Sequence, residues 1–193
     1  MKNVWFIRHG EAEHNARRIY GDVDSNLTER GRQQLVEAAQ QLKRLENAIT
    51  TIIASPMART KESAHIIADE LGLSRSQIKW DDRIRELKIG RFAGISHDPK
   101  VRLQRDQQFL TKNNTMGVEW IGDLVARIES FVADLRQRPE DTILIVGHNA
   151  SGRMLWRILG GQDHTKPMQK LKNAEIIQLY PYVEADPKAE KIL

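Results

Sequence analysis

The sequence contains no cysteine. This absence excludes disulfide bonds, zinc sites built on thiolates and a cysteine nucleophile. Long apolar runs are absent as well. The most apolar stretch near the N-terminus, Val4 to Ile7, ends at Arg8, whereas the core of a signal peptide needs about 7 to 15 apolar residues and a bilayer span needs about 18. We therefore expect a soluble, cytoplasmic protein that makes no contact with a membrane.

A large excess of one charge is also missing. The 193 residues include 30 Lys and Arg against 26 Asp and Glu, a formal net charge of +4. This mild positive charge suits an anionic ligand. It is too slight to indicate a protein that binds nucleic acid, and no basic stripe is interleaved with the aromatic residues. The length and a hydrophobic fraction of 40% predict one globular domain spanning residues 1–193.

Short apolar runs alternate with amphipathic segments along the chain. Buried strands are predicted over Val4 to Ile7, Ile49 to Ala54, Thr142 to Val146 and Ile176 to Tyr180. Helices are predicted after Thr28 and over Ala58 to Leu71, Val101 to Leu110, Val118 to Leu135 and Ser151 to Leu159, the last ending at Gly160-Gly161. This alternation predicts an α/β fold: a three-layer α/β/α sandwich around a mixed, mostly parallel sheet. From residue 181 onward we expect a loose tail.

Two histidines follow predicted strands at matching places. Arg8-His9-Gly10-Glu11 comes directly after the first strand, and Gly147-His148-Asn149 comes after the strand that ends at Val146. In an open α/β sheet, ligands bind beyond the carboxyl ends of the strands. The strand ending at Ala54 brings Ser55 and Arg59 to the same edge. We therefore expect two histidines and two arginines to share one crevice.

This set of side chains suits a phosphate monoester. Arg8 and Arg59 would bind the phosphoryl group, because the planar guanidinium fork contacts two oxygens at once. A neutral imidazole can attack phosphorus and hold the group as a phosphohistidine. His9 is the better nucleophile, since Gly10 beside it lets backbone amides approach the phosphoryl oxygens. His148 would then donate to the equatorial oxygens in the transition state.

The leaving alkoxide needs a proton, which a carboxylic acid can supply. Glu86 lies on an irregular excursion, at about residues 78–116, that we expect to cover the active site. It is our candidate for the general acid. Other acids near the motifs remain open as alternatives, namely Glu62, Glu119, Asp22 and Asp82.

The ordered motifs resemble those of the histidine phosphatase superfamily (phosphoglycerate mutase-like), in its phosphatase branch. The resemblance runs from Lys2 to about Leu179. The motifs read, in order, Arg8-His9-Gly10-Glu11 with Asn15; Gly21-Asp22 with Leu27-Thr28 and Gly31; Ser55 to Arg59 with Ser63-Ala64; Arg83 and Glu86 with Gly90 to Gly94; and Val146-Gly147-His148.

Carried over position by position, the resemblance assigns roles to individual residues. It implies His9 as the nucleophile and Glu86 as the general acid. It implies a phosphate pocket formed by Arg8, Arg59 and His148, with Asn15 as an added phosphate contact.

Three further residues are expected to bind substrate. Gly21 and Arg91 belong to these motifs, and Glu119 belongs to the Gly117-Val118-Glu119 stretch. Arg91 also belongs to a basic cluster with Arg17, Arg18 and Lys88, which is read either as a solvated face or as a surface that steers substrate.

The sequence departs from the family at positions that border the leaving group. Trp120 follows Gly117-Val118-Glu119 at a place where serine is common in relatives, and Phe92-Ala93 replaces a usual Trp-Glu pair. Ala12 replaces a frequent threonine, a lesser change. The substrate specificity of relatives is therefore not assigned to this chain.

The chain lacks the longer insertions of mutase relatives, which favours hydrolysis. We expect a phosphomonoester hydrolase for a small phosphorylated metabolite, acting through a phosphohistidine without cofactor or metal. The remaining histidines show no ligand spacing with acids; they are His14, His65, His97 and His164. The alternatives are a phosphoglycerate mutase of the same fold and a non-catalytic phosphate-binding module. Oligomeric state is not predicted.

Overall fold

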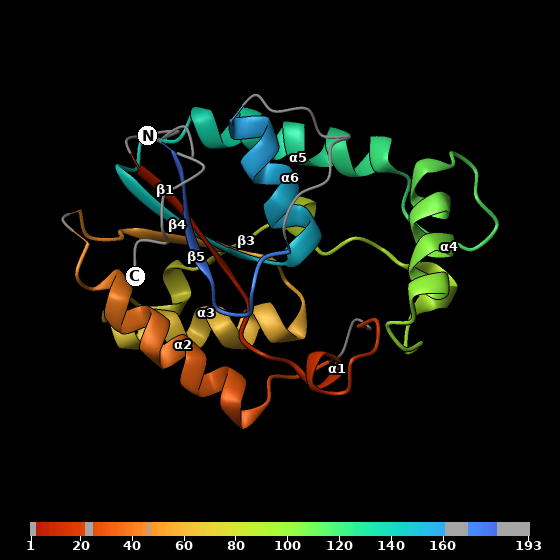
Figure 1. Ribbon diagram of the computed structural model, residues 1–193. Helices are drawn as coiled ribbons and strands as arrows, with labels where there is room; N and C mark the ends of the chain where they lie inside the picture. The colour runs from red at the N-terminus through yellow and green to blue at the C-terminus, as the bar shows by residue number, and fades with distance from the viewer. Residues whose placement is uncertain (1–2, 22–24, 46, 161–169, 181–193) are drawn as a thin grey trace, which may run out of the picture.

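The computed structural model describes residues 3–21, 25–45, 47–160 and 170–180 (Figure 1). These residues form five strands in one sheet, ordered β3-β2-β4-β1-β5. The strands are β1 (Asn3–Arg8), β2 (Thr51–Ala54), β3 (Lys79–Trp80), β4 (Thr142–Gly147) and β5 (Ile176–Tyr180). All neighbouring pairs are parallel except β1 and β5, which are antiparallel. The expected mixed, mostly parallel sheet is confirmed.

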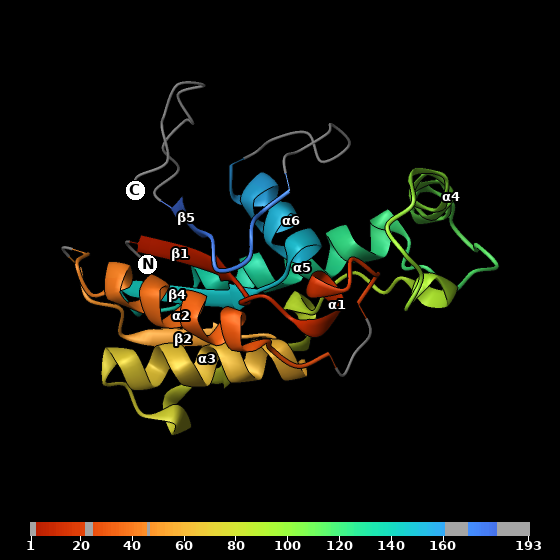
Figure 2. The ribbon, with the colours of Figure 1, turned by 60° about the horizontal axis from the view of Figure 1, so that its bottom comes forward.

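Helices cover both faces of this sheet, as predicted for a three-layer sandwich. One face carries α2 (Glu29–Leu42) and α3 (Ala58–Leu71), and the other carries α5 (Ile121–Arg136) and α6 (Asn149–Leu159) (Figure 2). The remaining helices, α1 (Glu13–Ala16) and α4 (Pro99–Leu110), lie beyond the carboxyl ends of β1 and β4 (Figure 1). No helix among the described residues has both the length and the apolar character needed to cross a membrane.

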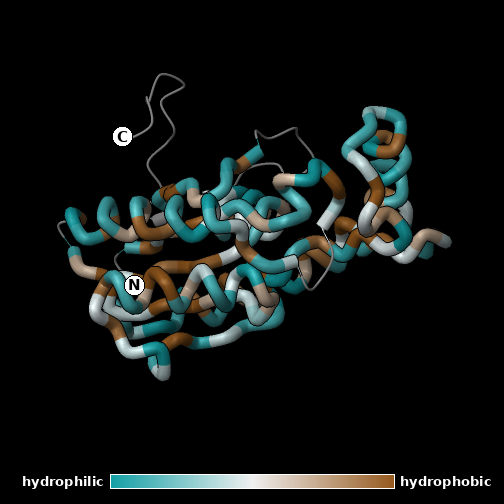
Figure 3. The backbone as a smooth tube through the Cα atoms, turned by 90° about the horizontal axis from the view of Figure 1, so that it is seen from below, coloured by the Kyte–Doolittle hydropathy of each residue, from teal (hydrophilic) through white to brown (hydrophobic). Residues whose placement is uncertain are grey.

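The central strand β4 shows why the sequence folds this way. All of its residues are buried, and successive side chains point to opposite faces of the sheet. Ile143 and Ile145 pack with the core under α5 and α6, whereas Leu144 and Val146 pack with the core under α2 and α3. The apolar segments enclosed between the helix layers are visible in brown in Figure 3. A continuous apolar run is therefore the expected signature of this strand.

Strand register fixes the position of the functional edge. Val146 of β4 pairs with Ile7 of β1 on one side and with Ala54 of β2 on the other. The three strands consequently end at the same level. Two backbone hydrogen bonds extend this alignment by one residue, from His9 N–H to the Gly147 carbonyl (3.0 Å) and from Ser55 N–H to the Val146 carbonyl (3.1 Å).

Several element boundaries differ from the sequence predictions. The helix predicted from Val118 begins at Ile121, because Val118 forms a bridge with Ile89 and Trp120 is the N-cap residue. The last helix begins at Asn149 and not at Ser151, since His148 serves as its N-cap. The strand predicted from Ile49 begins at Thr51. The short elements α1 and β3 were not predicted. Gly161 and the predicted loose tail from residue 181 lie outside the described residues.

The excursion at about residues 78–116 contains more regular structure than its sequence indicates. After β3 it forms short 3₁₀ turns at Asp82–Ile84 and Gly90–Phe92, and then α4. Gly90 has a φ of +55° and packs directly against the backbone carbonyl of Met116, so that a Cβ at this position would collide with it. The excursion therefore closes on itself, with its middle part at Gly90 beside its end at Met116.

Candidate active site

Four side chains from three strand ends lie together at the carboxyl edge of the sheet. Arg8 ends β1, His9 follows it, Arg59 lies in the first turn of α3, and His148 caps α6. All are buried, with exposed fractions of 4%, 1%, 2% and 0% in that order. The imidazole centroids of His9 and His148 are 5.4 Å apart. The structure thus brings together the two histidines and two arginines selected from the sequence.

The hydrogen bond of His9 determines which of its nitrogens is free to react. Its Nδ1 lies 2.7 Å from the Gly10 carbonyl oxygen. A carbonyl oxygen can only accept, so Nδ1 carries the proton and Nε2 keeps its lone pair. Burial lowers the pKa of His9 well below its ordinary value, and the charges of Arg8 and Arg59 lower it further. The imidazole is therefore neutral and nucleophilic at physiological pH.

His148 is held by a different partner. Its Nε2 lies 2.8 Å from the hydroxyl of Ser55, the residue that follows β2. Burial lowers the pKa of His148 well below its ordinary value, and the nearby charge of Arg59 adds to the effect. A neutral ring at this position can offer one N–H to a bound oxygen without bringing a further charge into the site.

The two buried arginines give this pocket its charge. The Nη1 group of Arg8 donates to the Leu171 carbonyl at 2.7 Å. Burial lowers the pKa of Arg8, while the charges of Glu86 and Glu175 oppose that change. Taking two guanidinium groups out of water is costly unless an anion joins them. The pocket is accordingly suited to a dianion such as a phosphoryl group.

Glu86 lies against the first turn of α6. Its carboxylate accepts hydrogen bonds from the backbone N–H groups of Asn149 (3.1 Å) and Ala150 (2.9 Å), and from that of Leu87 (3.0 Å). The N-terminus of a helix favours a carboxylate at this place. Because His148 immediately precedes these amides, the candidate acid and the second histidine lie at the same end of α6.

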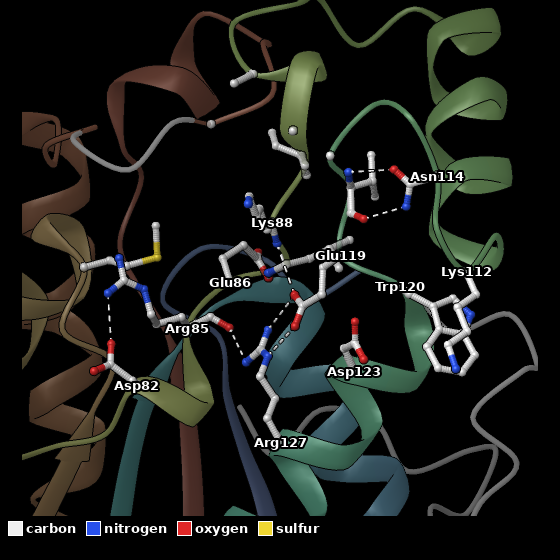
Figure 4. Close-up of a pocket in the computed structure, with 18 of the residues that line it drawn as sticks. Asp82, Arg85, Glu86, Lys88, Lys112, Asn114, Glu119, Trp120, Asp123 and Arg127 are labelled. Carbon is white, nitrogen blue, oxygen red and sulfur yellow. Dashed lines mark hydrogen bonds and ion pairs between the residues drawn. The ribbon is translucent and has the colours of Figure 1, made fainter.

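A cavity of about 860 Å³ opens beside Arg59 and Glu86 (Figure 4). Arg59 and Glu86 belong to its lining, as do Gly21 and Glu119. The walls come mainly from the excursion and from the first turn of α5. A leaving group bonded to a phosphoryl group on Arg59 would thus extend past Glu86 into this space.

The other residues predicted to bind substrate have varied environments. Asn15 Oδ1 accepts from the Ala12 amide at 3.1 Å and from Asn173 Nδ2 at 3.0 Å. The Glu119 carboxylate is engaged by Arg127 at 2.6 and 3.0 Å (Figure 4). Gly21 packs against the ring of His14.

Two of the predicted substrate residues, Asn15 and Arg91, do not belong to the cavity lining. The Arg91 side chain is exposed. Arg17, Arg18 and Lys88 are exposed as well. Lys88 nevertheless belongs to the cavity lining (Figure 4), whereas the exposure of Arg17, Arg18 and Arg91 matches a solvated face.

The alternative acids are placed less favourably than Glu86. Glu62 accepts from Arg32 Nε at 2.7 Å and from the Leu27 amide. Asp82 lines the cavity, but it pairs with Arg85 at 2.9 Å. Asp22 lies outside the described residues.

Three further residues complete the site, and sequence reasoning did not find them. Asn173 donates to the carbonyls of His9 (3.2 Å) and Gly10 (3.1 Å). The Asn149 carboxamide accepts from the Leu171 amide at 3.0 Å. The ring of His14 lies 6.0 Å from that of His9. Burial lowers the pKa of His14 to about 3, with smaller effects from Arg59 and Arg8.

The signals for these residues were weak. Asn149 directly follows His148 in the second-histidine motif, so its place in the sequence could have indicated a position in the site. Asn173 lies in a segment without pattern, and its role depends on the turn that brings β5 back beside β1. Within the part of the chain that the structure describes, no three His, Asp or Glu side chains converge as ligands for a metal ion.

Comparisons with known proteins agree with this geometry. The model of the histidine phosphatase superfamily (branch 1) matches residues 4–186. A protein of Enterobacter sp. (strain 638), described as "Probable phosphoglycerate mutase GpmB", is 34% identical over 187 residues, covering 93% of this chain and 85% of the relative.

Solved structures show the same fold. YhfR of Bacillus stearothermophilus superposes with a TM-score of 0.76 at 25% identity, covering 92% of this chain and 90% of that one. A mycobacterial glucosyl-3-phosphoglycerate phosphatase superposes with a TM-score of 0.73 at 25% identity, covering 92% and 89%. The family match covers nearly the whole chain. The two histidines and two arginines of this chain lie buried at one edge of the sheet. The chain therefore belongs to the histidine phosphatase superfamily, whose phosphoglycerate mutase-like members it resembles throughout its length.

Proposed function

We propose that this protein hydrolyses phosphomonoesters of small metabolites through a phosphohistidine on His9, without a metal or cofactor. The observation that carries the proposal is the bond from His9 Nδ1–H to the Gly10 carbonyl at 2.7 Å. It leaves Nε2 unprotonated in a pocket with two buried guanidinium groups. These cations supply the positive charge that phosphoryl transfer needs.

In the first step, His9 Nε2 attacks phosphorus. The N–P bond forms as the bond between phosphorus and the ester oxygen breaks. Arg8 and Arg59 hold the nonbridging oxygens, and His148 donates to one of them as negative charge spreads over the transition state. Glu86, in its protonated form, gives its proton to the departing oxygen.

In the second step, water attacks the phosphohistidine. Glu86, now ionised, takes a proton from the water as its oxygen bonds to phosphorus. The N–P bond breaks, the electron pair returns to Nε2, and inorganic phosphate leaves. One carboxyl group thus serves as acid and then as base, because the two steps are the same displacement in opposite directions.

A phosphoglycerate mutase is the second candidate, because the relative at 34% identity is described as a probable enzyme of that kind. Both reactions begin with the same phosphohistidine. They differ in whether water or a second hydroxyl group takes the phosphoryl group. A mutase would interconvert 2- and 3-phosphoglycerate much faster than it releases phosphate, and would need priming by a bisphosphate.

The test measures phosphate release from p-nitrophenyl phosphate. The wild type is expected to release phosphate in the presence of EDTA, and His9→Ala is expected to release none above background. Acid-labile ³²P on the wild type, absent from His9→Ala, would identify the phosphohistidine. Equal activity in the two proteins contradicts the proposal. A coupled mutase assay run in parallel separates the two candidate reactions, and a protein that binds phosphate but is never labelled is a non-catalytic module.

A further inference from the structure

Arg127 lies beside the segment that carries Glu86 and has no part in the proposed steps. It belongs to α5, and its side chain lines the cavity (Figure 4). Glu86 follows the 3₁₀ turn at Asp82–Ile84 and belongs to no helix or strand itself. A general acid must be held in a defined position relative to the departing oxygen. The α6 amides hold the carboxylate of Glu86, and its backbone needs a second support.

The hydrogen bonds of Arg127 supply that support. Its Nη1 group donates to the Arg85 carbonyl at 2.9 Å and also to the Arg83 carbonyl. Its Nε and Nη2 groups donate to the two carboxylate oxygens of Glu119 at 2.6 and 3.0 Å (Figure 4). All three nitrogens of the guanidinium group thus donate to oxygens of the protein. Arg127 is therefore engaged in holding the chain, although its side chain lines the cavity.

The bond to the Arg85 carbonyl acts directly on Glu86. A peptide group is planar, so the carbonyl of Arg85 lies in one rigid plane with the backbone nitrogen and Cα of Glu86. Fixing the direction of this carbonyl consequently fixes the point from which the Glu86 side chain extends. The bond to the Arg83 carbonyl fixes the turn that precedes this peptide.

Glu119 holds the same segment on the other side of Glu86. Its carboxylate accepts from the Lys88 amide at 3.2 Å, and its own amide donates to the Lys88 carbonyl at 2.8 Å. The ion pair of Arg127 with Glu119 therefore binds the chain both before and after the acid.

The burial of this ion pair indicates what it contributes. The side chains of Arg127 and Glu119 are only 19% and 14% exposed. At such burial, the cost of removing both charges from water offsets much of their attraction, so the pair adds little net stability. A guanidinium fork on a carboxylate does, however, impose a defined geometry. The main contribution of the pair is therefore to position the segment that it holds.

We infer that Arg127 is a positioning residue for the general acid. It holds the backbone of Glu86 so that the carboxyl group, bound at the end of α6, faces the departing oxygen. The inference rests on the proposed function and adds to it a residue that touches neither phosphorus nor the leaving group. Arg127 keeps its own protons throughout; the proton that reaches the departing oxygen is that of Glu86.

The test measures the first step alone, as single-turnover transfer of the phosphoryl group to His9. Glycerol 2-phosphate has an alkoxide leaving group that needs a proton, whereas p-nitrophenolate leaves without one. Arg127→Met should slow transfer from glycerol 2-phosphate by about ten- to a hundredfold, since a displacement of about 1 Å can cost about a hundredfold. Transfer from p-nitrophenyl phosphate should slow much less. Arg127→Lys keeps the charge but not the fork and should give an intermediate loss.

A double variant shows whether Arg127 acts through the acid. In the Glu86→Gln background, Arg127→Met should cause no further loss with glycerol 2-phosphate, because the group that it positions is already absent. The matched control is Arg136→Met, which removes an exposed arginine in the last turn of the same helix and should leave both rates unchanged. Glu119→Gln keeps an oxygen acceptor for Arg127 and should retain most of the rate.

Three results would overturn the inference. The first is an equal loss for both esters, and the second is an additional loss in the double variant. The third is a fall in the affinity of the His9→Ala protein for glycerol 2-phosphate, measured by calorimetry, that accounts for the whole loss of rate, because Arg127 would then be a substrate ligand.

The readouts also separate this inference from the proposed function. Transfer from p-nitrophenyl phosphate in the same preparation shows that the phosphoryl pocket is folded, and Arg127→Lys keeps the ion pair if Arg127→Met does not fold. If neither ester phosphorylates the wild-type protein, the proposed function fails. If both esters do so and the Arg127 variants slow them equally, the proposed function stands and only the role of Arg127 fails.

Discussion

The Ser55 hydroxyl oxygen lies 2.8 Å from Nε2 of His148, and both side chains are completely buried. A neutral imidazole has one donor and one acceptor nitrogen. If Ser55 donates its O–H to Nε2, the proton of His148 resides on Nδ1. No described residue hydrogen-bonds to that atom, so it is available to a phosphoryl oxygen. Ser55 is thus a positioning residue for the second histidine.

Ser55→Ala is expected to lower kcat/KM for p-nitrophenyl phosphate by about tenfold, because a buried hydrogen bond that orients His148 contributes about 1 kcal/mol or somewhat more. ¹⁵N chemical shifts of His148 should show a mixture of tautomers in this variant. Ser63→Ala is the control, since that buried hydroxyl bonds to the Arg59 carbonyl within α3. Unchanged tautomer populations in Ser55→Ala would contradict the assigned role.

The effect of Glu86→Gln should depend on the leaving group. An alkoxide needs a proton to depart, whereas p-nitrophenolate leaves without one. We therefore expect kcat for an alkyl phosphate to fall about a hundredfold or more, and kcat for p-nitrophenyl phosphate to fall much less. Steady-state kinetics with both esters, and with Glu119→Gln as a control in the same cavity, provide the measurement. An equal loss of kcat for both esters would mean that a group other than Glu86 protonates the departing oxygen.

Stability should decline in mild acid. The pKa values of His9, His148 and His14 are all lowered in the folded protein, that of His14 to about 3. In the unfolded chain these histidines take up protons near pH 6.5. Below that pH the unfolded state binds more protons, so the free energy of unfolding falls as the pH falls. Urea unfolding from pH 7 to pH 4.5 should show this slope, and His14→Gln should flatten it. A variant with the slope of the wild type would refute the contribution of His14.

Gly31→Ala should damage both stability and activity. A Cβ at Gly31 would collide with the backbone of Glu11, in the segment directly after His9. We expect a loss of about 1–3 kcal/mol in the free energy of unfolding, as for other overpacked sites, together with a lower kcat. Gly72→Ala is the matched control: its φ of +71° strains the backbone, but nothing lies within 4 Å of the new methyl. That variant should lose stability and keep its activity.

Most of the fold was predictable because its main strands are buried. The apolar runs around Phe6 and Ile145 are enclosed on both faces, which gives a continuous hydrophobic signal. Strand β3 gave no such signal, since Lys79 and Trp80 are both exposed and are held by pairing with Ile53 and Ala54 of β2. The short α1 was missed for a related reason: none of its residues is buried.

The core of the site was predictable for a different reason. His9 and His148 directly follow strands whose register makes them end together, so position in the sequence determines position in space. Arg91 shows the limit of this reasoning, because a 3₁₀ turn points it to solvent and no strand end constrains it. Asn173 was not predictable, since its contact with His9 depends on an antiparallel strand added after the parallel core.

The attachment of Glu86 to α6 has a practical consequence. The amide protons of Asn149 and Ala150 point at the Glu86 oxygens, so their resonances are spectroscopic probes of the charge on that carboxyl. Since Asn149 also follows the second histidine, the same two signals respond when a phosphate analogue fills the pocket. Two backbone amides can therefore follow proton transfer and ligand arrival in one titration, without a label on either catalytic side chain.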